Sequence, residues 1–178
     1  MTGPSLVDQL LATHRCLDAA GIPHAFGGAL ALAWCTRRAR GTVDLDLNLF
    51  VPVERAREVL EAMPDGVEWS DEHLDAVERD GQVRVFWEAT PLDLFWNTTP
   101  FHEQAAGRAR VESFAGAEVP FLSCDDLGVF KAFFDRTKDW ADLEEMAAMG
   151  SLDLDRVIGV LVRYLGPADH RIERLRTL

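Results

Sequence analysis

Two aspartates placed two positions apart are the residues of this chain best spaced for chemistry. Asp44 and Asp46 stand in the run TVDLDL, residues 42–47. Side chains of a strand alternate between its faces, so both carboxylates would stand on one face while Val43, Leu45 and Leu47 enter the core. Adjacent carboxylates repel each other, and a site that keeps both ionised requires cations. Hard oxygen ligands suit Mg²⁺ or Mn²⁺, so the pair predicts a divalent metal site.

A glycine turn upstream adds a second element. Residues 22–26 (IPHAF) read as a short buried strand, Gly27-Gly28 end it, and residues 29–34 (ALALAW) begin a helix. This order aims backbone N–H groups and the positive end of a helix at an anion, and glycine lets a phosphate approach the backbone. Alternating Asp and Leu also fits an ordinary half-exposed strand, and a lone Gly-Gly is a common turn. The combination favours a phosphate site beside a metal site.

A third carboxylate occurs in a similar setting downstream. Asp93 lies in PLDLFW (91–96), which follows the β-rich run QVRVFW (82–87). A second strand with one acid beside the first would complete a cluster of three carboxylates. Alternatively, Asp93 is a surface residue of an edge strand. Glu88 is the competing third acid, but a turn before Pro91 would displace it.

The order of these motifs resembles the minimal nucleotidyltransferases of the DNA polymerase β-like superfamily. Its parts are Gly27-Gly28, a helix, the run Arg40-x-Thr42-x-Asp44-x-Asp46, and Asp93. The chain looks most similar to the AbiEii-type toxin nucleotidyltransferases and to the small antibiotic-modifying ones. It departs from their pattern in having one residue between Thr42 and Asp44, and in lacking a serine after the first glycine.

The resemblance continues into the second half of the chain. In KAFFDRTKDWADL (131–143), a lysine on one helix precedes two acids at the start of the next helix. The likeness implies that Lys131 contacts nucleotide phosphates and that Asp139 or Asp142 orients it or closes the site. Alternatively, these two acids only complement the dipole of the second helix. The nucleotide-binding residues implied are Gly27, Gly28, Arg40, Thr42, Lys131, Asp139 and Asp142.

The resemblance implies transfer of a nucleotide monophosphate from an NTP to a hydroxyl acceptor, with release of pyrophosphate. Asp44, Asp46 and Asp93 would hold two Mg²⁺ (or Mn²⁺) ions, and together with Lys131 they form the expected catalytic set. An AbiEii-like protein would use tRNA as acceptor and could have an antitoxin partner. The alternatives are a small cationic antibiotic of the aminoglycoside or lincosamide type as acceptor, a catalytically inactive nucleotide-binding relative, and an α/β interaction protein.

Composition points to a cytoplasmic protein without a membrane segment. The chain has 178 residues, 48% of them apolar, and a net charge of −12. This charge opposes non-specific binding to nucleic acid, so a tRNA acceptor would need a local basic surface. The candidates are Arg37, Arg38 and Arg40 after the glycine helix and Arg163, Arg171, Arg174 and Arg176 near the C-terminus, which alternatively are solvated helix faces. The stretch 22–36 is too short to span a bilayer. Cys16, Cys35 and Cys124 are few and scattered, which predicts reduced thiols.

The pattern of elements predicts an α/β (α+β) fold, with a mixed sheet flanked by helices. We expect a nucleotidyltransferase-like core over 1–122 and a helical segment over 123–178, packed as a single compact unit. Helices are predicted at 4–20, 29–34, 52–62 and 101–108, and strands at 22–26, 42–47, 67–70, 83–87 and 92–96. A hairpin is expected over 109–122, and Ser123 would cap the first of the C-terminal helices.

Overall fold

The computed structural model describes residues 3–178, which form two compact units. The first unit comprises the chain up to Gly27 together with Gly41–Phe121, and the second comprises Gly28–Arg40 with Leu122–Leu178. We expected residues 28–40 in the core over 1–122, whereas the structure groups them with the C-terminal helices. Within residues 3–178, no helix is long and apolar enough to cross a membrane.

A seven-stranded mixed sheet organises the first unit. Its strands lie in the order β3 (Val67–Glu68), β4 (Gln82–Trp87), β5 (Thr90–Asn97), β2 (Leu45–Pro52), β1 (His24–Phe26), β7 (Ala117–Phe121) and β6 (Arg110–Phe114). The pairs β2–β5 and β1–β7 are parallel, and the other pairs are antiparallel. The sheet confirms the predicted α/β class.

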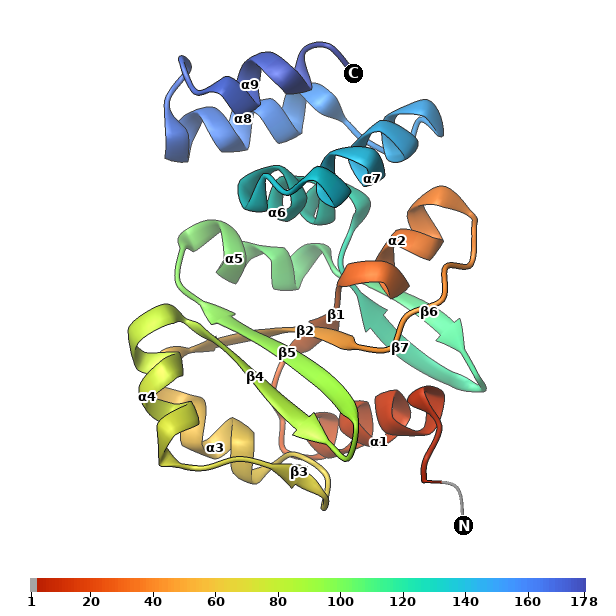
Figure 1. Cartoon of the computed structure of the whole chain (residues 1–178), viewed down its shortest axis with the longest axis vertical. Coiled ribbons are helices and arrows are strands. Elements are labelled where there is room, and N and C mark those ends of the chain that lie inside the picture. Colours follow the sequence, from red (N-terminus) through yellow and green to blue (C-terminus); the bar gives the residue numbers. More distant parts are fainter. Residues whose placement is uncertain (1–2) are drawn as a thin grey trace. The chain divides into compact units, whose positions relative to one another are not determined.

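Helices flank both faces of this sheet (Figure 1). In the view of Figure 1, α1 (Leu6–Ala19), α3 (Ala56–Glu61) and α4 (Asp71–Asp80) lie below the sheet, and α5 (Pro100–Ala105) lies above it. Short 3-10 turns over Val53–Arg55 and Ala106–Arg108 adjoin α3 and α5.

The alternation of apolar residues along β2 and β5 sets which face of each strand is buried. Leu45, Leu47 and Leu49 are each at most 1% exposed, and they pair in register with Leu92, Leu94 and Trp96, which are equally buried. A slip by one residue would turn this apolar set to the opposite face, so the pattern holds the register. The residues between the leucines therefore share the other face of the sheet.

The second unit is helical. It contains α2 (Gly28–Thr36), α6 (Cys124–Phe134), α7 (Thr137–Ala148), α8 (Leu154–Leu165) and α9 (His170–Leu175). The most deeply buried side chains include Trp140, Leu143, Met146 and Leu161, all 0% exposed. Ser123 caps α6 by accepting a hydrogen bond from the backbone N–H of Asp126, as the sequence predicted.

A disulfide joins Cys35, near the end of α2, to Cys124, the first residue of α6. The prediction of reduced thiols is therefore wrong for these two cysteines, and Cys16 is the free one among residues 3–178. The two partners are 89 positions apart in the sequence, and only the packing of α2 with α6 brings their Cα atoms to 5.6 Å.

Most predicted elements are confirmed, with two differences near the candidate site. Val43 was expected in the core but is 78% exposed, because β2 begins two residues later, at Leu45. Helix α4 was not predicted, although Ser70 at its N-cap and Gly81 at its C-cap, with φ +69°, are typical helix boundaries. Leu74, Ala76 and Val77 are the apolar residues of this helix, so the run reads as a polar segment in the sequence.

Candidate active site

Three charged residues form a row across adjacent strands of the first unit. Asp46 on β2 is the register partner of Asp93 on the parallel strand β5, and Asp93 is in turn the register partner of Arg84 on β4. Neighbouring strands lie about 4.8 Å apart, and register partners share a face of the sheet. The fold therefore brings together two of the predicted carboxylates and adds a cation beside them.

Arg84 holds Asp93 through both of its carboxylate oxygens. The Nε of Arg84 donates to Oδ1 of Asp93 and its Nη2 donates to Oδ2, each at 2.7 Å. The pKa of Arg84 is raised, mainly by its hydrogen bonds to Asp93 and next by the charge of Asp93. Burial lowers this pKa to a smaller extent, and the charges of Asp44 and Asp46 raise it slightly further. The guanidinium of Arg84 thus interacts electrostatically with all three aspartates.

Asp44 lies just before β2, and a threonine fixes its orientation. The hydroxyl of Thr42 donates to Oδ1 of Asp44, and the backbone N–H of Asp44 approaches the same hydroxyl oxygen at 3.4 Å. Thr42, predicted to bind nucleotide, therefore positions a predicted metal ligand in this structure. Glu88, the competing third acid, is exposed in the turn between β4 and β5, with φ +53°.

The glycine turn is hydrogen-bonded to the aspartate strand. The backbone N–H of Gly27 donates to the carbonyl oxygen of Asp46 at 2.9 Å, so this N–H group is already used within the first unit. Gly28, the next residue, has φ +54° and begins α2. A left-handed backbone at a helix start favours glycine, and unsatisfied N–H groups follow at the N-terminus of the helix. Of the two glycines predicted to bind phosphate, Gly27 therefore has its N–H group engaged within the first unit, and the prediction for Gly28 stays a prediction.

The candidate metal ligands of the first unit are carboxylate oxygens, the type of ligand that divalent cations such as Mg²⁺ prefer. Asp44, Asp46 and Asp93 supply hard oxygen ligands, and the guanidinium of Arg84 already stands where the three negative charges attract a cation. Both oxygens of Asp93 are bound to that guanidinium. Among residues 3–178, no three His, Cys, Asp or Glu side chains form a ready-made metal site.

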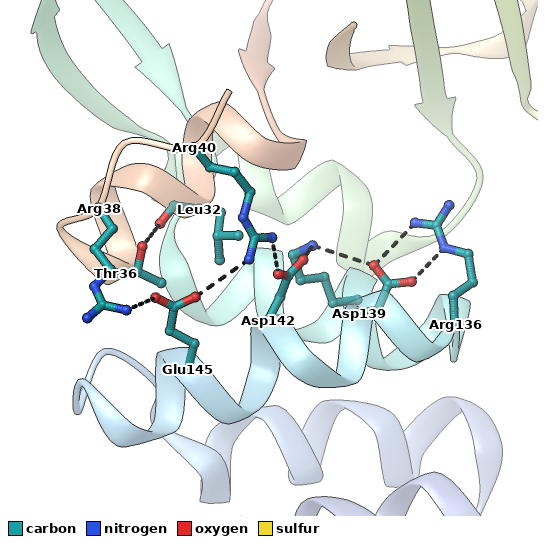
Figure 2. Close-up of polar contacts among 9 residues, drawn as sticks. Leu32, Thr36, Arg38, Arg40, Arg136, Asp139, Asp142 and Glu145 are labelled. Atoms are coloured by element: carbon teal, nitrogen blue, oxygen red, sulfur yellow. Dashed lines mark hydrogen bonds and ion pairs between the residues drawn. The ribbon is translucent and has the colours of Figure 1, made fainter. Parts of the chain in front are cut away.

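In the second unit, Lys131 lies within a buried network of ion pairs. Figure 2 labels Arg40, Asp142, Asp139 and Arg136 of this network. Its Nζ is 2.6 Å from Oδ2 of Asp142 and 3.5 Å from Oδ1 of Asp139. Arg136 also binds Asp139, at 2.6 Å, and Arg40 binds Asp142. The lysine is 8% exposed and the two aspartates are 0% and 4% exposed. The structure thus brings together Arg40, Lys131, Asp139 and Asp142, which the sequence predicted as nucleotide-binding residues.

The network extends to the segment that follows α2, after Thr36. Figure 2 shows Arg38 and Arg40 on either side of Glu145. The ion pair between Arg38 and Glu145 measures 3.3 Å, and the one between Arg40 and Glu145 measures 3.7 Å. Two of the arginines that could have formed a basic surface are therefore paired with acids of α7. Asp139 is not a simple helix cap, because it is fully buried and bound to Lys131 and Arg136.

Arg84, Arg136 and Glu145 are polar partners that the sequence motifs did not identify. Arg84 lies between Val83 and Val85 on β4, so its side chain points to the face opposite theirs. The turn at residues 88 and 89 fixes the register of β4 and β5, which pairs Arg84 with Asp93. A hairpin register counted from that turn would have found it. Arg136 and Glu145 bind partners on the same helical unit, and the sequence has no local signal for them.

No protein-family model matches the chain, and no curated protein matches it in sequence. Solved structures do match. The structure of ANT(2'')-Ia in complex with adenylyl-2''-tobramycin has a TM-score of 0.52 and 18% identity, and the match covers 96% of this chain and 94% of that one. An antigenic nucleotidyltransferase-like protein from Paracoccidioides brasiliensis has a TM-score of 0.51 and 15% identity, over 94% of this chain and 93% of that one. The chain therefore has the nucleotidyltransferase fold.

Proposed function

We propose that the protein is a metal-dependent nucleotidyltransferase that moves a nucleotide monophosphate from an NTP to a hydroxyl group of a small cationic acceptor. The observation that carries this proposal is the register pairing of Asp46 on β2 with Asp93 on β5. On its other side, β2 is hydrogen-bonded to the glycine turn, through Gly27. The fold supports the same class of reaction, because nucleotidyltransferases share it.

The proposed roles follow from the chemistry of each group. Asp44, Asp46 and Asp93 would hold the metal ions, and Asp93 would also accept the proton of the attacking hydroxyl. Two bound divalent cations would supply charge stabilisation to the attacking and leaving oxygens of an in-line displacement at the α-phosphate. Gly28 would offer its backbone to the terminal phosphates. Lys131 stays a predicted phosphate contact, and in the second unit it is held by Asp139 and Asp142.

Charge favours a small cationic acceptor over tRNA. The chain carries a net charge of −12, and binding to nucleic acid relies on neutralising phosphates with basic side chains. Arg38 and Arg40 are engaged by acids of α7. An aminoglycoside is polycationic and carries hydroxyl groups, and the ANT(2'')-Ia structure contains an adenylylated one. The AbiEii-like alternative keeps tRNA as acceptor.

Transfer can be measured with α-labelled NTPs and Mg²⁺ against a panel of aminoglycosides and bulk tRNA. We expect a labelled aminoglycoside and no labelled tRNA. Asp46→Asn should abolish transfer, while Asp65→Asn, in the exposed turn after α3, should leave it unchanged. Labelled tRNA would favour the AbiEii-like alternative, and no stabilisation by any NTP with Mg²⁺ in thermal unfolding would reject the transferase proposal.

A further inference from the structure

Arg84 stands where the carboxylate site would receive a cation. Its fork binds both oxygens of Asp93 at 2.7 Å, and Asp93 is the register partner of Asp46. A bidentate guanidinium uses the same carboxylate lone pairs that a metal ion would use. The pairing therefore leaves Asp93 poorly available as a metal ligand.

The positive charge of Arg84 also attracts the other two aspartates of the site, Asp44 and Asp46. Asp44 and Asp46 both act on Arg84 through their charges, in addition to its direct partner. Because three carboxylates act on this one guanidinium, its charge lowers their mutual repulsion while their oxygens keep their attraction for a divalent cation. Arg84 thus reduces the repulsion among the acids without neutralising them.

We propose that Arg84 is an internal competitor of the metal, which must release Asp93 before that carboxylate can coordinate a divalent cation. This inference rests on the proposed metal-dependent function and adds a control on the same site. Arg84 is a positioning residue here, since it acts through Asp93.

Release requires movement of the Arg84 side chain and not loss of its proton. Guanidinium groups stay protonated in proteins, so Arg84 cannot release Asp93 by losing its own proton. The side chain of Arg84 is 52% exposed and that of Asp93 is 21% exposed. Water can therefore solvate the guanidinium of Arg84 once it leaves Asp93, and the loss of the two hydrogen bonds sets the cost of this movement. Once released, its charge would be available to the phosphates of a nucleotide.

The test measures Mn²⁺ affinity directly, through the electron paramagnetic resonance signal of free Mn²⁺, without nucleotide or acceptor. Arg84→Gln should lower the dissociation constant by about fivefold, the change expected when an ion pair worth about 1 kcal/mol no longer opposes the metal. Arg84→Lys, which keeps the charge but loses the fork, should give a smaller change. Arg79→Gln is the matched control, because Arg79 is exposed and paired with Asp80 outside the site, and its loss changes the net charge equally.

Two further measurements separate this inference from the proposed function. Asp46→Asn should abolish Mn²⁺ binding in the wild-type and Arg84→Gln backgrounds. If Mn²⁺ binds in an Asp46-dependent way and Arg84→Gln leaves its affinity unchanged or weaker, the competition is refuted while the metal site stands. If neither background binds Mn²⁺ through Asp46, the metal-dependent function fails together with the inference. Mg²⁺ should also shift the NMR signal of the Arg84 Nε–H group, and an unmoved signal on saturation would contradict the release.

Discussion

Asp46 and Asp93 are register partners on two parallel strands, although they are far apart in the sequence. The leucines that flank each aspartate are buried on the opposite face, so the apolar pattern that builds the core also aligns the two carboxylates. Parallel strands require a crossover connection, and here it contains α3, α4 and the strand β4 that carries Arg84. One topological unit therefore supplies both acids and the cation, in the order Arg84, Asp93 and Asp46 across the strands β4, β5 and β2.

Replacing Asp93 should reduce the rate of transfer strongly while changing the free energy of unfolding only slightly. Asp93→Asn breaks a partly exposed ion pair, so the free energy of unfolding should fall by no more than about 1 kcal/mol. Transfer should slow by at least about 100-fold, because a proposed ligand and proton acceptor is lost. Urea unfolding and the labelled-transfer assay measure the two effects. Glu112→Gln is the matched control, since Glu112 pairs with Arg110 on β6; equal effects of the two variants on transfer would argue against a role for Asp93.

The sequence predicted the strands of the site because their signals are local. Alternation over residues 45–49 and 92–96 identifies both strands and assigns the acids to one face, and Gly27-Gly28 marks the turn before α2. Val43 was misplaced because alternation does not show where a strand begins. Pairing of β2 with β5 was expected from the need to cluster the carboxylates, and the structure places Asp46 beside Asp93.

Contacts between distant residues could not be predicted in the same way. Cys35 and Cys124, or Arg40 and Asp142, meet through the packing of α2 with α6 and α7, and nothing near them in the sequence specifies a partner. The hairpin register that pairs Arg84 with Asp93 is an intermediate case, because it follows from the turn at residues 88 and 89 once that turn is recognised.

Lys131 should be essential for the stability of the helical unit. Lys131→Met would leave Asp139 and Asp142 buried with fewer positive partners, and breaking a buried ion pair on one side costs about 3–5 kcal/mol. We expect a loss of this order in urea unfolding. Lys138→Met is the matched control, because Lys138 is exposed on α7. If the Lys131 variant unfolds like the wild type but loses transfer, the lysine acts on the nucleotide alone.

The disulfide should contribute substantially to stability through the loop that it closes. Cys35 and Cys124 are 89 positions apart, and in the chain-entropy model a cross-link over a loop of this size contributes roughly 4–5 kcal/mol. A reducing agent should therefore lower the melting temperature of the wild type. The Cys35→Ser, Cys124→Ser double variant should melt lower and not respond to the reductant. Cys16→Ser, at the free cysteine, should respond like the wild type; a wild type insensitive to reduction would contradict the expected contribution.

Acid should destabilise the protein through a buried histidine. Burial lowers the pKa of His102 from 6.5 to about 4, while a backbone hydrogen bond with Trp96 acts in the opposite direction. Between these two values the unfolded chain binds a proton that the folded chain does not, so stability is fully present above pH 6.5 and falls as the pH drops. The loss attributable to His102 reaches about 3 kcal/mol near pH 4.

Urea unfolding at several pH values between 7.5 and 4 measures this loss. His102→Gln removes the titrating group, so its free energy of unfolding should fall less steeply with acid than that of the wild type. His73→Gln is the matched control, since His73 lies in the first turn of α4, where glutamine can keep the capping contact with Ser70. Because carboxylates titrate equally in all three proteins, the difference between the slopes isolates His102. Equal slopes for the wild type and His102→Gln would mean that the folded protein accepts the proton at His102 without cost.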